Sequence, residues 1–555
     1  MSSRIVDAPE AVHTGLVVLD GIGLGVADVV RLADGTARPV PGTDAMKRVT
    51  ESWDAARQIA ATGRVYGRST GVGANRNEDV PTEAAAEHGL RLLRSHAGAI
   101  GDELPSRQVR AMLAVRANQL LAGGAGLRPT VVTALCEALE NGAYPVVNEF
   151  GSVGTGDIAA LAQVGLALAG EHPWRASGTG AGAGGPSGGL GERAFGGSTD
   201  AHGSAAAGAA GSVAVGATGF TAVGAPGSAA VGAPDPQALD NNDALAFISS
   251  NALTLGQSAL ALHELRGLIE ATQVVAALSL LAVDGSHEAY AAPVHAARPH
   301  RGSARVARRM RELIGAADRP TPPLGRIQDP YGFRCLPQIH GPAHDAADAL
   351  EEVLAIEINA AAENPLISPE DMAAYHHGGF YQAQLALALD HFRLALTQVA
   401  RLSTSRLSTL NEPAYTRLRP FLADHEPASS GVMILEYAAG AALGDLRAFS
   451  APASLGHAVL SRGVEEQASF ASLAARQTVR ACRAYRLVVG CELVAAVRAL
   501  RQRDLRPDPD LPVGRALRLA DSVLQEDQAD RPLTDDVTAA AALLDRFTDI
   551  WRGSE

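Results

Sequence analysis

The chain has 555 residues, of which 47% are hydrophobic and only 4% aromatic, and its formal net charge is −13. A chain of this length can bury a large core, and a core built mainly from Ala, Leu and Val favours helices. The negative charge, without a Lys/Arg cluster interleaved with aromatic residues, argues against nucleic acid or an anionic membrane as partner; we expect a small molecule.

The cysteines and the N-terminus bear on cofactor and compartment. The four cysteines lie far apart without metal-ligand spacing: Cys136, Cys335, Cys482 and Cys491. The polar start Met1-Ser2-Ser3-Arg4 lacks the apolar segment of a signal peptide. We therefore expect no metal, no membrane association and a reduced, cytoplasmic protein.

Two short segments near the N-terminus carry chemically active side chains. The first is Tyr66-Gly67-Arg68-Ser69-Thr70-Gly71-Val72-Gly73, in which glycines supply tight-turn geometry. The second, Arg94-Ser95-His96-Ala97-Gly98, contains one histidine. Taken singly, a tyrosine in a turn and a lone histidine are more often structural than functional.

A glycine-rich loop follows at Gly151-Ser152-Val153-Gly154-Thr155-Gly156-Asp157. Its plainest interpretation is a turn before a helix that starts near Asp157, capped by Thr155 or Asp157.

Composition divides the chain into four parts: 1–174, 175–236, 237–505 and 506–555. The second part is rich in Gly, Ala and Ser, with Ala-Val-Gly-Ala at 214–217, 222–225 and 230–233. Few large apolar residues offset its ordering entropy, so we expect a flexible surface insertion. The first part carries the two loops above, and the last is expected to form a helical cap.

Four long segments with few breakers predict helices: Ala252–Val283, His344–Ala362, Tyr381–Leu402 and Phe470–Leu505. Helices of this length indicate a mainly α fold, an elongated helical bundle. The first segment is apolar but contains Glu264 and Arg266, so it is expected to be a buried bundle helix and not a membrane span. Such a bundle would bury further apolar faces by oligomerising.

The segment Gln328-Asp329-Pro330-Tyr331-Gly332-Phe333-Arg334-Cys335-Leu336-Pro337-Gln338 is the longest motif. Gln328, Tyr331 and Arg334 are spaced three and three, so a helical turn would place them on one face. A guanidinium there can hold an α-carboxylate with two parallel hydrogen bonds. A surface ion pair is the competing interpretation of Arg334.

These segments, in this order, resemble the histidine and aromatic amino acid ammonia-lyase family. The family patterns are Tyr-Gly-x-Asn-Thr-Gly-Phe-Gly, Ser-His-Ala, Gly-Ser-Val-Gly followed by Ala-Ser-Gly-Asp, and Gln-Asp-x-Tyr-Ser-Leu-Arg-Cys-x-Pro-Gln. A further segment, Ser461 to Ser469, aligns with Ser-x-x-Gln-Glu-Asp-His-Val-Ser. The resemblance spans roughly residues 60 to 480 and implies the fumarase/aspartase-like helical bundle.

The resemblance also implies a prosthetic group made from the backbone. In the family, Ala-Ser-Gly cyclises into a methylidene-imidazolone (MIO); here the loop is one residue shorter and reads Gly154-Thr155-Gly156. Gly156 lacks the Cβ that would block attack of its nitrogen on the carbonyl of Gly154. Dehydration of Thr155 would give an ethylidene variant, with an extra methyl on the carbon that a substrate amine attacks.

Site roles follow from the resemblance, position by position. Tyr66 falls on the base for the β-hydrogen, with Tyr331 and Glu465 in the catalytic set. Arg334 falls on the carboxylate-binding residue, and Gln328 lines the pocket beside it. His96 and Glu465 fall on positions near the substrate ring. The family's substrate-positioning Asn aligns with Ser249, and Asn251 substitutes for it after a small shift. In the family these segments meet from three subunits of a homotetramer.

The leading hypothesis is an ammonia-lyase that acts on L-histidine or an aromatic L-amino acid. An aminomutase would use the same residues and return the ammonia to the β-carbon. A protein of this fold without the prosthetic group could catalyse another elimination or addition. A helical scaffold that only binds an amino acid or a partner protein is the fourth hypothesis.

Overall fold

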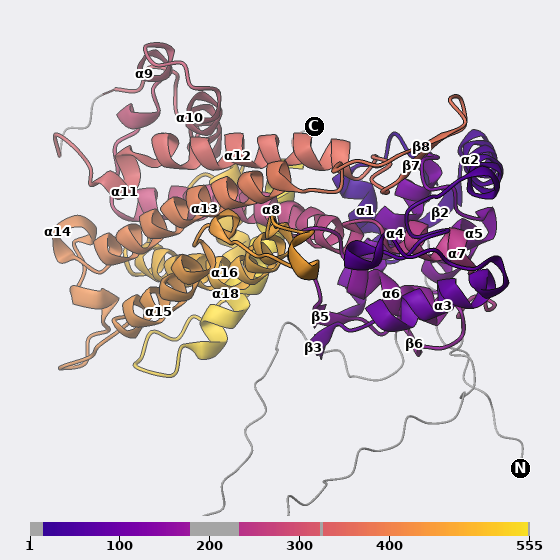
Figure 1. The fold of residues 1–555 in the computed structure, drawn as a ribbon. Helices are drawn as coiled ribbons and strands as arrows, with labels where there is room; N and C mark the ends of the chain where they lie inside the picture. Colours follow the sequence, from indigo (N-terminus) through magenta and orange to yellow (C-terminus); the bar gives the residue numbers. More distant parts are fainter. Residues whose placement is uncertain (1–14, 178–231, 322–325, 553–555) are drawn as a thin grey trace, which may run out of the picture.

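The computed structural model describes residues 15–177, 232–321 and 326–552. Long helices run side by side through the middle of the molecule, and shorter helices and strands gather at one end (Figure 1). The predicted mainly α, elongated helical bundle is therefore confirmed. Most of the predicted insertion at 175–236 lies outside the described residues, while Arg175 and Ala176 belong to a short strand.

The N-terminal part, indigo to purple in Figure 1, contains helices of up to 20 residues and, from Gly15 onward, six short strands. Its elements are β1 (Leu16–Leu19), α1 (Val26–Ala33), β2 (Arg38–Pro41), α2 (Thr43–Thr62), η1 (Gly73–Asn75), η2 (Thr82–Ala84), α3 (Ala85–His96), β3 (Ile100–Glu103), α4 (Ser106–Leu121), α5 (Pro129–Glu140), β4 (Ala143–Pro145), β5 (Asn148–Phe150), α6 (Ile158–Leu168) and β6 (Trp174–Ala176).

The central part carries the bundle and one further strand pair. Its elements are α7 (Asn241–Ile248), α8 (Ala252–Ala282), η3 (Glu288–Tyr290), α9 (Ala292–Ala296), α10 (Arg301–Ile314), α11 (Tyr331–Arg334), α12 (Leu336–Glu357), β7 (Leu366–Ser368), β8 (Ala373–Tyr375), α13 (Ala383–Leu410), α14 (Pro413–Thr416), η4 (Pro420–Leu422), α15 (Ile434–Phe449), η5 (Ala453–Leu455), η6 (Ser461–Gly463) and α16 (Ala471–Gln502). The predicted C-terminal cap contains α17 (Pro512–Asp521), α18 (Thr534–Phe547) and α19 (Asp549–Arg552).

The strands form four separate two-stranded sheets in the described residues. The β1–β2 pair is parallel, with Leu16 opposite Arg38, and the β3–β5, β4–β6 and β7–β8 pairs are antiparallel. The register of β3–β5 shifts between Ile100 and Glu103. These small sheets brace loops at the N-terminal end, whereas the core lies in the helices.

Helix α8 is the central rod of that core. It packs against α4, α12 and α16, and its apolar residues are buried on all sides, as expected for a helix without a polar face. Gly256 allows close contact with α4, because a Cβ there would lie 2.9 Å from the Ala111 carbonyl carbon. The segment Asn241–Ala282 is long and apolar enough to cross a membrane, but 78% of its most apolar 18-residue stretch is buried inside the protein. The prediction of a buried bundle helix is confirmed.

Two predicted helix boundaries need correction. The helix expected at His344–Ala362 runs from Leu336 to Glu357. It begins earlier because Pro337 lies in the first turn, where a missing N–H costs nothing. Helix α13 continues past the predicted end at Leu402 to Leu410, since buried Leu407 and Leu410 pack into the core. The predicted α8 and α16 are within three residues of the observed ends.

Candidate active site

Tyr66 lies in the turn after α2, beside the segment that carries Glu465. The Gly73 N–H donates to the Tyr66 Oη at 2.7 Å, and the Ala74 N–H donates to the Ser461 Oγ at 3.0 Å. A Cβ on Gly73 would lie 3.8 Å from a Glu465 carboxylate oxygen. The two loops, almost 400 residues apart in the sequence, are therefore joined, and Tyr66 and Glu465 belong to one cluster.

The environment of Tyr66 makes its phenol a weaker acid. Burial raises the pKa of Tyr66, the hydrogen bond from Gly73 opposes that rise, and the charge of Glu465 adds to it. The Tyr66 ring also meets the His376 ring edge to face, with centroids 6.3 Å apart. Any reaction that needs the phenolate is thus favoured by alkaline conditions or by a nearby cation.

The glycine-rich loop is held by serines from two directions. The Ser152 Oγ accepts from the Gly154 N–H at 3.1 Å and donates to the Gly156 carbonyl at 3.0 Å. The Ser469 Oγ donates to the Gly154 carbonyl oxygen at 2.7 Å, just before α16 begins. The loop is therefore clamped against the N-terminus of α16.

Asn251 reaches this loop, and Ser249 does not. The Gly156 N–H donates to the Asn251 Oδ1 at 3.2 Å, and the Asn251 Nδ2 donates to the Phe380 carbonyl at 2.7 Å. The Ser249 Oγ instead accepts from the Asn364 N–H at 3.1 Å. Of the two predicted candidates, Asn251 occupies the position beside the loop.

Asp157 is buried behind the loop and does not cap α6 as predicted. Its side chain accepts no hydrogen bond from the N-terminus of α6. The two carboxylate oxygens accept instead from the Thr254 N–H at 2.8 Å and the Thr254 Oγ1 at 2.9 Å. Burial raises the pKa of Asp157, and the Thr254 hydrogen bonds oppose the rise. The carboxylate ties the loop to α8.

His96 ends α3 on the same side of the molecule. The segment after it contacts the loop directly, because a Cβ on Gly151 would lie 2.9 Å from the Ala99 Cβ. The His96 Nδ1 lies 2.8 Å from the Leu92 carbonyl oxygen and 3.0 Å from the Ser95 Oγ. The segment that follows His96 therefore adjoins the start of the loop, at Gly151.

The third predicted group lies at the opposite end of the bundle. Tyr331 and Arg334 share the single turn α11, with the guanidinium carbon 4.3 Å from the tyrosine ring centroid, whereas Gln328 precedes that turn. Gly332 contacts Arg406 near the end of α13, whose Nη1 donates to the Gly332 carbonyl at 3.2 Å. Phe380, beside the loop, lies just before α13 begins.

Tyr331 and Arg334 are therefore far from the glycine-rich loop within one chain. From Ala383 to Arg406 the helix advances by about 35 Å, at 1.5 Å per residue. Figure 1 shows α11 at one end of the bundle and the N-terminal part at the other. Tyr331 is 65% exposed, and the Arg334 Nε is a buried donor without a hydrogen-bond partner. Within one subunit, the segment 461–469 contacts the turn after Tyr66 through Ser461 and the glycine-rich loop through Ser469, whereas α11 lies apart from both.

Several contact residues were not predicted from the sequence. Ser152 and Ser469 stand inside quoted motifs, but nothing in their spacing signals a hydrogen bond to the loop. Phe380 contributes through its backbone carbonyl, which no side-chain pattern identifies. His376 has no motif around it.

The fold is that of a class of helical-bundle proteins that contains ammonia-lyases and aminomutases. Ergothionase from Treponema denticola, an ergothioneine degrading enzyme, superposes with a TM-score of 0.81 at 23% identity, over 96% of this chain and 99% of that one. Tyrosine aminomutase from Streptomyces globisporus gives a TM-score of 0.82 at 23% identity, over 97% and 98%. Both are similar to this chain in fold.

The chain belongs to the aromatic amino acid lyase family, whose model matches residues 24–522. Histidine ammonia-lyase of Geobacillus thermodenitrificans (strain NG80-2) is 30% identical to it over 536 residues, covering 95% of this chain and 97% of that relative. The resemblance inferred from the motifs is confirmed at the level of the family.

Proposed function

We propose that this protein is an ammonia-lyase that eliminates ammonia from L-histidine or an aromatic L-amino acid to give an α,β-unsaturated acid. Family membership supports the reaction class. His96, just before the segment that contacts the loop at Gly151, and Glu465 in the Tyr66 cluster support a substrate with a polar, imidazole-like ring. The relatives that share 30% identity or more include histidine ammonia-lyases.

The observation that carries the proposal is the pair of hydrogen bonds that Ser469 and Asn251 make with Gly154 and Gly156. Ring closure must join the Gly154 carbonyl carbon to the Gly156 nitrogen. The Ser469 hydroxyl donates to that carbonyl oxygen and polarises it, while the Gly156 N–H donates a hydrogen bond to the Asn251 Oδ1. A Cβ on residue 154 would lie 2.2 Å from the Ser469 Oγ, so glycine suits this loop where the family has alanine. These residues fit an imidazolone.

The chain's own residues then supply binding and proton transfer. The imidazolone, once formed from Gly154, Thr155 and Gly156, would supply an electrophile for the substrate amine. Tyr66 accepts the β-proton, the C–H electron pair becomes the second Cα–Cβ bond, and the C–N bond breaks as ammonia leaves. Glu465 and His96 orient the side chain.

The carboxylate would be held from a second copy of the chain. Arg334, with Tyr331 and Gln328 around it, can bind an α-carboxylate with two parallel hydrogen bonds. Its distance from Tyr66 within one subunit supports a site shared between subunits of a cytoplasmic homotetramer.

The first experiment is the high-resolution mass of the proteolytic peptide that spans Gly151 to Asp157. We expect the loss of two waters, and release of ammonia from at least one of L-histidine, L-tyrosine and L-phenylalanine. In Ser469→Ala the loop should stay unmodified. In the control Ser472→Ala, which removes a hydrogen bond to the Ser152 carbonyl, the loop should still lose two waters. An unmodified wild-type peptide would leave a reaction driven by Tyr66 alone.

The second candidate function is an aminomutase on the same substrates. Tyrosine aminomutase shares the fold over 97% of this chain. Product analysis separates the two, because a mutase yields a β-amino acid and a lyase yields free ammonia. Tyr66→Phe tests whether either reaction occurs: turnover should fall by about 100-fold or more, as for loss of a general base, with substrate binding retained.

A further inference from the structure

A strongly basic segment stands out in this acidic protein. Residues 298–311 contain six arginines and no Asp or Glu, although the whole chain carries a net charge of −13. Most of the segment forms α10, which buries its apolar face, including Val306 and Met310, against the bundle. Arg301 and Arg308 are exposed, whereas Arg309 and Arg311 are largely buried.

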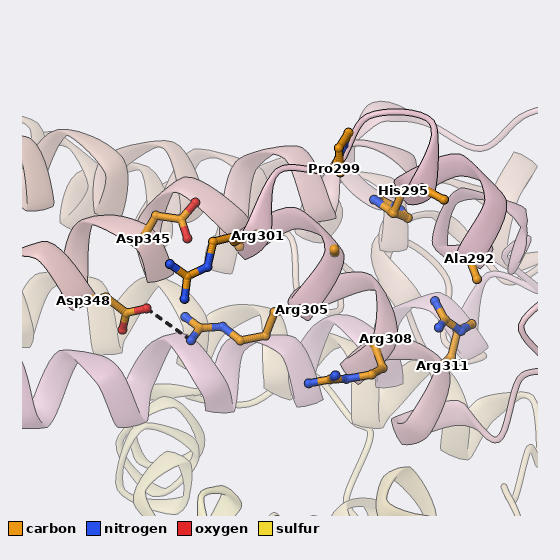
Figure 2. Close-up of a pocket in the computed structure, with 12 residues that line it drawn as sticks. Ala292, His295, Pro299, Arg301, Arg305, Arg308, Arg311, Asp345 and Asp348 are labelled. Carbon is orange, nitrogen blue, oxygen red and sulfur yellow. Dashed lines mark hydrogen bonds and ion pairs between the residues drawn. The ribbon is translucent and has the colours of Figure 1, made fainter.

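Four of these arginines line one cavity of about 650 Å³ beside α9 and α12 (Figure 2): Arg301, Arg305, Arg308 and Arg311. Positions 301, 305 and 308 are four and three residues apart, so they lie along one helix face. The helices approach closely here, because a Cβ on Gly302 would lie 2.2 Å from the Gly341 carbonyl oxygen. This contact fixes the wall that α12 provides.

The cavity is lined by fewer carboxylates than arginines. Only Asp345 and Asp348 line it, and Asp348 also binds Arg266 outside it at 2.6 Å. Arg305 contacts Asp348 at 3.3 Å, but its Nε is a buried donor without a partner.

The other arginines differ in how far they are engaged. Arg311 is bound to Asp318 at 2.8 Å and closes one side. The contact of Arg308 with Glu312 is 3.6 Å long and exposed, and such pairs compete weakly with a ligand. Within the described part of the chain, Arg301 has no ion pair.

We propose that this cavity binds a small molecule with two linked phosphate groups. Arginine presents a planar fork of donors that fits phosphate oxygens. From Arg301 to Arg308 the helix advances by about 10 Å. One phosphate is too small to contact Arg301, Arg305 and Arg308 together. The volume lies within the range of about 300–1,000 Å³ of small-molecule sites.

The test is calorimetric titration of the full-length protein with sodium pyrophosphate, with inorganic phosphate and with ADP as separate ligands. Pyrophosphate should bind saturably and more tightly than phosphate; tighter binding of ADP would identify a nucleotide as the source of the diphosphate. Arg301→Ser and Arg308→Ser should each weaken pyrophosphate binding by about tenfold, as expected for loss of a charged hydrogen bond. Arg417→Ser, at a 75% exposed arginine elsewhere, is the matched control and should change it less than twofold.

Three results would overturn the proposal. They are the absence of pyrophosphate binding by the wild type at millimolar concentration, equal weakening by Arg417→Ser, and a change of oligomeric state in Arg301→Ser without any binding by the wild type. The last would assign the arginines to a contact with an acidic surface of a second copy. None of the substituted residues belongs to the proposed active site, so failure here leaves the lyase proposal standing.

Discussion

Gly154 occupies a position that no other residue can share. Its φ of +88° lies in the region that side chains disfavour. A Cβ would also lie 2.8 Å from the backbone nitrogens of Phe470 and Ala471, which cannot move as a side chain can. The substitution of glycine for the family's alanine is thus coupled to the way this shortened loop meets α16.

Gly154→Ala should therefore lose both the loop modification and stability. We expect a decrease of about 1–3 kcal/mol in the free energy of unfolding, from strain and overpacking. Urea denaturation and the mass of the loop peptide measure the two effects. Gly63→Ala is the control, since its backbone is extended and nothing lies within 4 Å of the added Cβ. Equal stability of both variants would contradict the close packing.

The pKa of Tyr66 gives a pH dependence with a definite sign. A general base must be deprotonated, so a raised pKa moves the rise of kcat/KM toward higher pH. Glu465 contributes to that rise through its negative charge. Glu465→Gln should therefore shift the Tyr66 titration to lower pH, whatever its effect on substrate binding.

A difference titration isolates this tyrosine. Phenolate absorbance is measured with and without Tyr66→Phe, in the wild-type and Glu465→Gln backgrounds. Glu466→Gln, which alters the neighbouring charge, should leave the Tyr66 titration in place. An unchanged Tyr66 titration in Glu465→Gln would show that the two groups do not interact.

At the scale of elements, a buried ion pair fastens the segments around Asn251. The Arg116 side chain of α4 is fully buried and binds Glu363 at 2.7 Å. Its Nε also donates to the Phe247 carbonyl of α7 at 2.9 Å. One guanidinium thus joins α4, the end of α7 and the loop before β7.

Glu363→Ala should be strongly destabilising because it leaves Arg116 charged and buried. Removing one partner of a buried pair costs about 3–5 kcal/mol. Asp44→Ala breaks the exposed pair with Lys47 and should change the free energy of unfolding little, because water screens that pair. Chemical denaturation of the two variants compares the costs; similar values would mean that water reaches Arg116.

The sequence predicted the long helices better than it predicted the hydrogen bonds of the candidate site. The segments of α8 and α16 contain few helix breakers, and their predicted ends lie within three residues of the observed ones. The prediction ended α13 at Leu402, but burial of Ser403 and Arg406 against Glu492 keeps the helix intact beyond that residue. Motifs predicted roles for Tyr66, Arg334 and the loop, whereas the hydrogen bonds of Ser469 and Asn251 to the loop join segments over 90 residues apart and leave no local pattern.

For the whole molecule, exposed apolar side chains on the bundle are consistent with assembly. They gather on α12, α13 and α15: Ile356, Leu387, Leu394, Ile434 and Tyr437, each 48–68% exposed. Burying such side chains is favourable, and large apolar patches commonly mark protein interfaces. These faces support the proposed homotetramer.

A shared site predicts rescue between two inactive variants. Tyr66→Phe and Arg334→Ala should each have little activity alone. In tetramers formed after mixed refolding or coexpression, about a quarter of the sites combine an intact Tyr66 with an intact Arg334 from another subunit. Activity should recover to about that fraction. No recovery, despite mixed tetramers confirmed by mass, would place both residues in one subunit's site.

Helix α13 has a consequence for chain length. One inserted residue would turn everything beyond it by about 100° and break the contact of Arg406 with Gly332. Seven inserted residues would nearly restore the rotation but lengthen the rod by about 10 Å. Amino acid exchanges on the exposed face of α13 should therefore be tolerated, whereas insertions and deletions should not. The number of residues between Phe380 and Arg406 is thus fixed by the distance between the two ends of the bundle.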